Sequence, residues 1–85
     1  MEEIQHYAVI VRGRAPNDPS GLARRVMHGD EIIDQSLRRD LSWTPTTAIV
    51  EWEYGEELMH DLRKISKTEA DELIEQFREK WSREG

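Results

Sequence analysis

The sequence predicts a small α+β domain: an antiparallel sheet of three to four strands, with a C-terminal amphipathic helix and a short helix packed on one face. Residues 6–14 are rich in β-branched and aromatic residues, residues 22–28 show a short and imperfect alternation, and the loop between them contains proline and glycine, as in a hairpin. Residues 66–84 instead repeat apolar side chains every three to four positions, which is typical of an amphipathic helix. With 85 residues, the chain is expected to form a single domain over residues 1–85.

Residues 6–14 form the first predicted strand. Tyr7, Val9 and Val11 alternate with Ala8 and Ile10, so apolar side chains lie on both faces. A strand with one face in water would instead alternate apolar and polar side chains. The segment is therefore expected to be an inner strand.

Residues 15–21 are predicted to form a surface loop, because Pro16 and Pro19 cannot donate backbone hydrogen bonds to a neighbouring strand. Residues 22–28 follow as a second strand, which ends at the turn residues Gly29 and Asp30. We expect the two strands to pair as a hairpin.

Residues 31–43 allow two interpretations. Ile33, Leu37 and Leu41 recur at four-residue spacing, as on one face of a helix. The residues just before Pro45 favour an extended backbone, because proline disfavours helical conformation in the residue that precedes it. A third strand ending near Trp43 is therefore the alternative.

Residues 46–54 are predicted to form a short helix, with Thr44 as its N-cap, Pro45 at its first position and Gly55 at its end. A strand remains the alternative for this segment, because β-branched residues are frequent and apolar residues alternate. The alternating residues are Ala48, Val50, Trp52 and Tyr54.

Residues 60–66 are short enough to form an edge strand, with Leu62 or Ile65 pointing inward. The C-terminal helix then begins after Ser66, because Glu69 stands three positions later and completes a capping box. Its apolar stripe is expected to pack across the sheet. The stripe consists of Ala70, Leu73, Ile74, Phe77 and Trp81.

The charge of the chain is negative and uneven. Its formal net charge is −6; residues 1–44 hold six arginines and seven acidic residues, whereas residues 45–85 hold six basic and eleven acidic residues. Nonspecific binding to nucleic acid normally requires a basic surface, so nucleic acid is a disfavoured partner and a basic protein a favoured one. There is no apolar run long enough to cross a membrane, and the lack of cysteine is compatible with the cytoplasm.

No catalytic, metal-binding or cofactor-binding residue is assigned from the sequence. His6, His28 and His60 lack the three- or four-residue spacing of metal ligands on a helix, and the glycines form no phosphate-binding loop. The serines lack the pattern of a nucleophile elbow. A small metal-dependent or hydrolytic enzyme would require His28 or His60 to converge with carboxylates, and it is kept as an alternative.

Six residues are candidates for contact with a partner. Arginine is the residue best suited to grip carboxylate or phosphate, and the predicted hairpin carries several arginines. The alternative is that these arginines pair with the acidic second half, for instance with Glu51 or Glu53. Trp52 and Tyr54 are added because one face of the short helix is expected to stay exposed. The candidates are Arg12, Arg14, Arg24, Arg25, Trp52 and Tyr54.

The segments "DPSGLARR" and "RRDLSWTPT" resemble those of a group of short uncharacterised actinobacterial and actinophage proteins, over residues 7–77. The resemblance implies the order strand, strand, extended Trp-Pro segment, helix, strand, helix, and it implies no activity. A phage origin would make a host protein the expected partner. The residues that carry the resemblance are Asp18, Pro19, Ser20, Gly21, Arg24, Arg25, Trp43, Pro45 and Thr46.

From the sequence we therefore expect a noncatalytic interaction or accessory protein of the cytoplasm that binds another protein, as a monomer or a homodimer. A nucleic-acid-associated regulator that uses the arginine-rich hairpin is the first alternative, and the small enzyme described above is the second.

Overall fold

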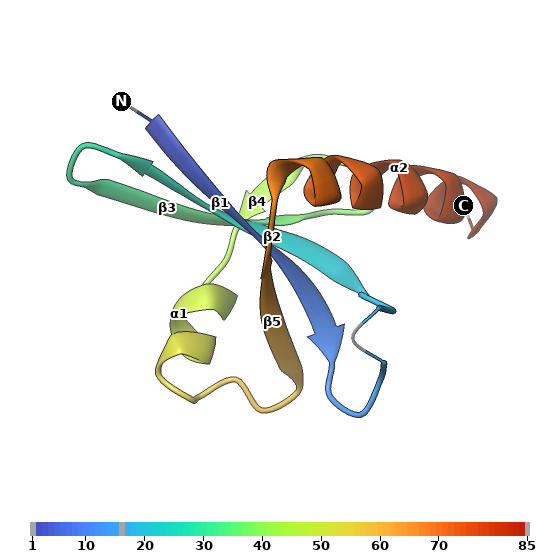
Figure 1. The fold of residues 1–85 in the computed structure, drawn as a ribbon, viewed down its shortest axis with the longest axis horizontal. Coiled ribbons are helices and arrows are strands. Elements are labelled where there is room, and N and C mark those ends of the chain that lie inside the picture. Colours follow the sequence, from blue (N-terminus) through green and yellow to red (C-terminus); the bar gives the residue numbers. More distant parts are fainter. Residues whose placement is uncertain (1, 16, 85) are drawn as a thin grey trace.

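Five antiparallel strands form one sheet in the computed structural model, which describes residues 2–15 and 17–84 (Figure 1). Pro16, part of the predicted loop, lies outside the described residues. The strand order across the sheet is β4-β3-β2-β1-β5. The elements are β1 (Glu2–Val11), β2 (Gly21–His28), β3 (Glu31–Leu37), β4 (Trp43–Pro45), α1 (Ala48–Glu53), β5 (His60–Ile65) and α2 (Lys67–Glu84).

The predicted α+β class is confirmed, but the sheet has five strands among the described residues instead of three or four. The difference arises in residues 31–45, which form β3 and β4. Leu41 lies in the turn between them with φ of +68°, a left-handed conformation that ends any helical repeat at this position. The four-residue spacing of Ile33, Leu37 and Leu41 therefore does not reflect a helix.

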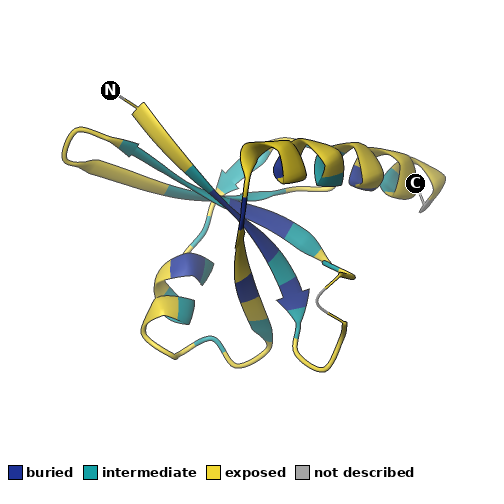
Figure 2. Ribbon diagram, viewed as in Figure 1, coloured by how far each residue is buried: buried dark blue, intermediate teal, exposed yellow. Residues whose placement is uncertain are grey.

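The two helices lie on opposite faces of the sheet, so the prediction that they share one face is wrong. Tyr7 and Ala8 are neighbours in β1 and point to opposite faces. Ala8 belongs to a core cluster with Phe77 of α2, whereas Tyr7 belongs to another with Ile49 of α1. Because β1 and β2 are apolar on both faces, each face requires its own cover, and Figure 2 shows buried residues on both helices.

Residues 48–53 are helical, which confirms the short helix over the strand alternative. The helix begins later than predicted, with Thr47 as its N-cap and Pro45 inside β4. The N–H of Thr46 donates a 3.1 Å hydrogen bond to the carbonyl oxygen of Asp34, which holds the chain against β3 up to that point. Gly55 follows the helix with φ of +73° and ends it, as predicted.

The C-terminal elements follow the sequence pattern closely. β5 is an edge strand, and both of its predicted inward residues, Leu62 and Ile65, are buried. The Ser66 hydroxyl oxygen accepts a 3.1 Å hydrogen bond from the N–H of Glu69 at the start of α2. Phe77 is buried against the sheet and stacks on Trp81, with ring centroids 4.7 Å apart. The amphipathic helix is thus confirmed.

The two-residue turn between β2 and β3 provides a first test of the fold. Gly29 has φ of +61°, so Gly29→Ala forces a side chain into left-handed backbone and should lower the free energy of unfolding by about 1 kcal/mol. The measurement is urea unfolding followed by circular dichroism. Gly21→Ala is the matched control: its added Cβ would meet only the Cβ of Val9 at 3.9 Å, and stability should be equal or higher. Equal losses in both variants would contradict this account.

Candidate functional site

Arg24 and Arg25 point to opposite faces of the sheet because they are neighbours in β2. The guanidinium of Arg24 lies 4.1 Å from the centroid of the Trp43 ring and donates a 2.8 Å hydrogen bond to the side-chain oxygen of Gln35. The arginine therefore packs over a tryptophan on the face that carries α2. Arg24 and Trp43 therefore contact each other within the fold.

Arg25 joins β2, β3 and α1 through two carboxylates. It donates hydrogen bonds of 2.8 and 3.0 Å to Asp34, and of 2.8 and 3.1 Å to Glu53. The hydrogen bonds to Asp34 and Glu53 raise the pKa of Arg25, and the bond from Arg25 lowers the pKa of Glu53. For Arg25, the structure bears out pairing with the acidic second half of the chain.

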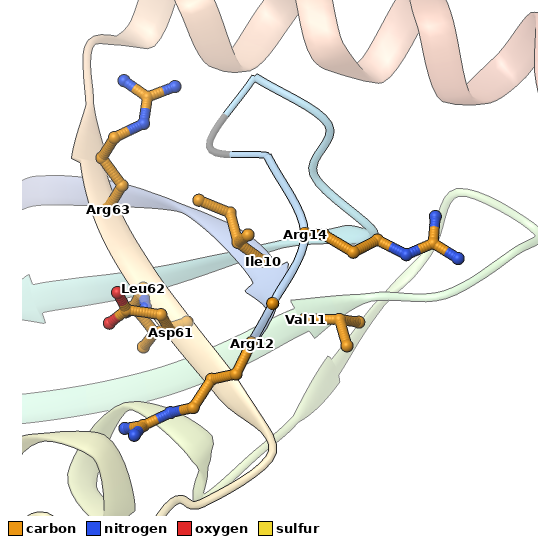
Figure 3. Close-up of a pocket in the computed structure, with 8 residues that line it drawn as sticks. Ile10, Val11, Arg12, Arg14, Asp61, Leu62 and Arg63 are labelled. Carbon is orange, nitrogen blue, oxygen red and sulfur yellow. The ribbon is translucent and has the colours of Figure 1, made fainter.

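Arg12 and Arg14 lie beyond the end of β1, beside an open hollow of about 500 Å³. Figure 3 shows the side chains of Arg12, Arg14 and Arg63 pointing in different directions around it. Arg12 donates to the carbonyl oxygen of Glu57 at 3.2 Å, and Arg14 pairs with Asp18 at 3.3 Å. The three guanidinium groups do not converge, so the hollow lacks the geometry of a clamp for one phosphate or carboxylate.

The arginines of the first hairpin do not form one basic stripe. Arg24 is opposite His6 in the register of β1 and β2, six positions from Arg12. At about 3.3 Å per residue, this separation is roughly 20 Å along the strand. Among the candidate residues, the structure thus separates Arg12 and Arg14 from Arg24, and directs Arg25 to the other face.

Trp52 is partly buried against the core cluster under α1, whereas Tyr54 is a surface residue. The Trp52 ring meets Tyr7 edge-on with centroids 6.1 Å apart, and its Nε1 donates a 2.9 Å hydrogen bond to Asp61. Tyr54, in contrast, is 77% exposed just after α1. Of the two aromatic candidates, Tyr54 alone presents most of its side chain to solvent.

The histidines are dispersed over the sheet. His28 is paired with Glu2 at one end of β1, and His60 is paired with Val11 at the other. Residues 2–15 and 17–84 contain no group of three His, Cys, Asp or Glu side chains placed to hold a metal ion. His60 does lie beside one carboxylate, with its Nδ1 3.4 Å from Oε1 of Glu57, but in this part of the chain the pair is not joined by further ligands for a metal ion.

An apolar surface that the sequence did not reveal lies where the sheet extends beyond both helices. We call it the hairpin tip and define it as Ile4, Val26, Met27, Ile32 and Ile33. The register places Ile4 opposite Val26 and Val26 opposite Ile33, so these three side chains form one row across β1, β2 and β3 on the α2 side of the sheet. Met27 and Ile32 are opposite each other on the other face.

Three of the five residues of the hairpin tip are exposed although they are large and apolar, and Val26 and Met27 are half-buried between them. Ile4, Ile32 and Ile33 are 42%, 61% and 47% exposed, and among the described residues neither core cluster includes a residue of the tip. Figure 2 shows this end of the sheet as mainly exposed, away from both helices. The sequence contained one signal for this surface, the turn at Gly29 and Asp30. Counting residues outward from a two-residue turn pairs Val26 with Ile33, as observed.

The segments that form the hairpin tip are acidic, and Arg24 and Arg25 directly precede them in β2. Residues 2–5 and 26–33 contain Glu2, Glu3, Asp30 and Glu31, together with His28 and no lysine or arginine. An apolar surface with carboxylates at its margin complements an apolar segment flanked by lysine or arginine.

Comparisons with known proteins add no function: no family model, curated protein or solved structure matches the chain. Within the described residues, no helix combines the length and apolar character needed to span a membrane.

The Arg25 network should matter for stability. Arg25 and Asp34 have side chains only 15% and 8% exposed, so Asp34→Ala leaves a largely buried arginine with Glu53 alone. We expect a loss of about 2–3 kcal/mol in the free energy of unfolding, measured with urea. The control Asp18→Ala removes a pair whose side chains are 64% and 57% exposed and should change stability by less than about 0.5 kcal/mol. A small effect of Asp34→Ala would contradict the structural role of the network.

His6 should make stability dependent on pH near neutrality. Burial, and secondarily the charge of Arg24, lower the pKa of His6 below its usual 6.5 in the folded protein. The unfolded chain therefore binds the proton more readily, so the contribution of His6 is complete above pH 6.5 and is lost as pH falls toward the folded-state pKa.

The measurement compares urea unfolding of wild type and His6→Gln between pH 7.5 and 5.5. Wild type should lose more stability over this interval than the variant, because the other histidines are common to both proteins. Parallel curves for the two proteins would show that His6 does not carry the effect.

Proposed function

We propose that this chain is a small noncatalytic protein of the cytoplasm that acts by binding another protein, and that the hairpin tip makes the contact. The observation that carries the proposal is the row Ile4, Val26 and Ile33, which the strand register makes continuous. Single exposed apolar residues are ordinary on protein surfaces, but a contiguous apolar row with exposed members such as Ile4 and Ile33 is typical of a site where another molecule binds.

A protein fits the hairpin tip better than other classes of partner. The carboxylates of Glu2, Glu3, Asp30 and Glu31 repel the phosphates of nucleic acid and the anionic head groups of membranes. They also oppose a second copy of this chain, which would bring the same carboxylates together. A partner segment with apolar side chains and flanking lysine or arginine avoids each of these penalties.

The contacts expected from the sequence are less well supported than the hairpin tip. Arg24, Arg25 and Trp52 already pack or pair within the fold. Arg12, Arg14 and Tyr54 are exposed but belong to other parts of the molecule. Tyr54 therefore serves as a test of the alternative surface.

The proposal is tested by affinity capture from lysate of the host cell with three forms of the chain. These are wild type, the tip variant Ile4→Ser/Ile33→Ser, and the control Tyr54→Ser, each first shown to be folded by circular dichroism. One protein should be retained by wild type and by the control, and the tip variant should retain at least about tenfold less, because central apolar anchors dominate binding energy.

Three results would count against the hairpin tip as a protein contact. Equal retention by the tip variant would place the contact elsewhere, and selective loss in Tyr54→Ser would place it at the end of α1. Recovery of nucleic acid alone, released by moderate salt, would favour the regulator alternative.

A further inference from the structure

Building on the function proposed above, we infer that the partner binds as an added β-strand. It pairs antiparallel with the open edge of β1 at residues 2–5, and it carries an apolar side chain beside Ile4 and a lysine or arginine beside Glu3. The occupant is thus an extended, basic and apolar segment of another protein.

The edge of β1 is open because β5 is shorter than β1. β5 pairs with β1 only from His6 to Val11. After Ile65, which lies opposite His6, the chain turns into α2 at Lys67. In the described part of the chain, residues 2–5 therefore have a neighbouring strand only on the β2 side.

The backbone groups on this open edge are those of Glu2 and Ile4. The N–H of Arg12 donates to the carbonyl oxygen of Met59, on the β5 side of the chain. The carbonyl oxygen of Val9 accepts from the N–H of Ser20, on the β2 side. Because N–H and C=O groups alternate along a strand, even-numbered residues of β1 face the β5 side, and Ile4 continues that side beyond the end of β5.

The side chains around this edge define what the added strand must contain. Ile4 is the outermost member of the row with Val26 and Ile33 on the α2 side, so a strand beside it would place a fourth side chain in that row. An apolar side chain there shields the row from water. The next residue of the added strand points to the other face, beside Glu3, where a basic side chain is favoured.

Other strand edges offer less to an incoming strand. The apolar side chains of β5, Leu62 and Ile65, are already buried, and its exposed side chains include Arg63 and Lys64, which protect an edge from pairing. β4 has three residues and ends at Pro45, which has no N–H to donate.

The exposed part of β3 is also a weaker edge. The carbonyl oxygen of Asp34 already accepts a hydrogen bond from Thr46. By the same alternation, the residue between this bond and the turn that faces outward is Ile32. On β3, an incoming strand could therefore pair with the N–H and C=O groups of Ile32 alone. On β1, it could pair with those of both Glu2 and Ile4.

The test uses the whole chain and a synthetic seven-residue peptide with blocked ends, in which lysine alternates with valine or isoleucine. Amide hydrogen exchange is followed residue by residue by NMR. At a peptide concentration ten times its Kd, exchange at the N–H of Ile4 should slow by about tenfold, because it then proceeds from the unbound fraction. Exchange at Ile32 should not change.

Two matched peptides separate backbone pairing from side-chain contact. N-methylation of the apolar residues removes the N–H groups that would pair with Ile4, and should weaken binding by at least about tenfold. N-methylation of the lysine residues alters the outward N–H groups and should leave binding unchanged. A peptide with glutamate in place of lysine should bind at least about tenfold more weakly, because it faces Glu3.

The outcomes distinguish the inference from the function on which it rests. Equal binding by the two methylated peptides, protection at Ile32 instead of Ile4, or no binding of the parent peptide would overturn strand addition at β1. Loss of capture by the tip variant would still support the hairpin tip as a protein contact. If capture is also unaffected by the tip variant, the proposed function falls with the inference.

Discussion

The structure depends on one constraint, which is that its two central strands are apolar on both faces. Tyr7 and Ala8 of β1 are both buried, as are Leu22 and Ala23 of β2, although each pair consists of neighbours that point in opposite directions. A sheet of this kind is unstable with one face in water. The positions of α1 and α2 on opposite faces follow from that requirement.

β5 connects the two covers. Leu62 and Ile65 are three positions apart, so one side chain reaches the cluster under α1 and the other reaches the cluster under α2. The chain enters β5 from α1 and leaves it for α2, and one short strand therefore places a helix on each face. The pairing of Arg25 with Glu53 fixes α1 further, by joining a basic residue of the first half to an acidic residue of the second.

The parts of the fold that could be predicted from the sequence are those with local causes. The start of α2 is encoded by Ser66 and Glu69, and its apolar stripe by residues within the same helix. β3 and β4 were harder to predict, because the turn between them places Leu41 in a left-handed conformation. Glycine or asparagine at that position would have indicated the turn, but leucine does not. The apolar pattern of β1 contained the information that both faces are covered, but the assignment of each helix to a face depends on the register of β5.

The candidate surface could be predicted only in part. The exposure of Tyr54 follows from its place at the end of a short helix, whereas that of Ile4 and Ile33 depends on where β5 ends and in which direction α2 runs. Those are tertiary properties. Arg25 and Trp52 illustrate the opposite case, since residue types that often bind partners are here used to hold the fold together.

The strand order has a consequence for how the chain holds together. β1 to β4 form a meander, in which strands that are neighbours in the sheet are also neighbours in the sequence. The second continuous segment consists of α1, β5 and α2; its strand pairs with one edge of the meander, and its helices cover both faces. Without the second segment, the meander would expose apolar side chains on both faces. Without the meander, the second segment has two helices and a single strand with no partner to pair with. We therefore expect that neither segment is a folding unit, and that cutting the chain between β4 and α1 would yield two fragments that are ordered only in each other's presence.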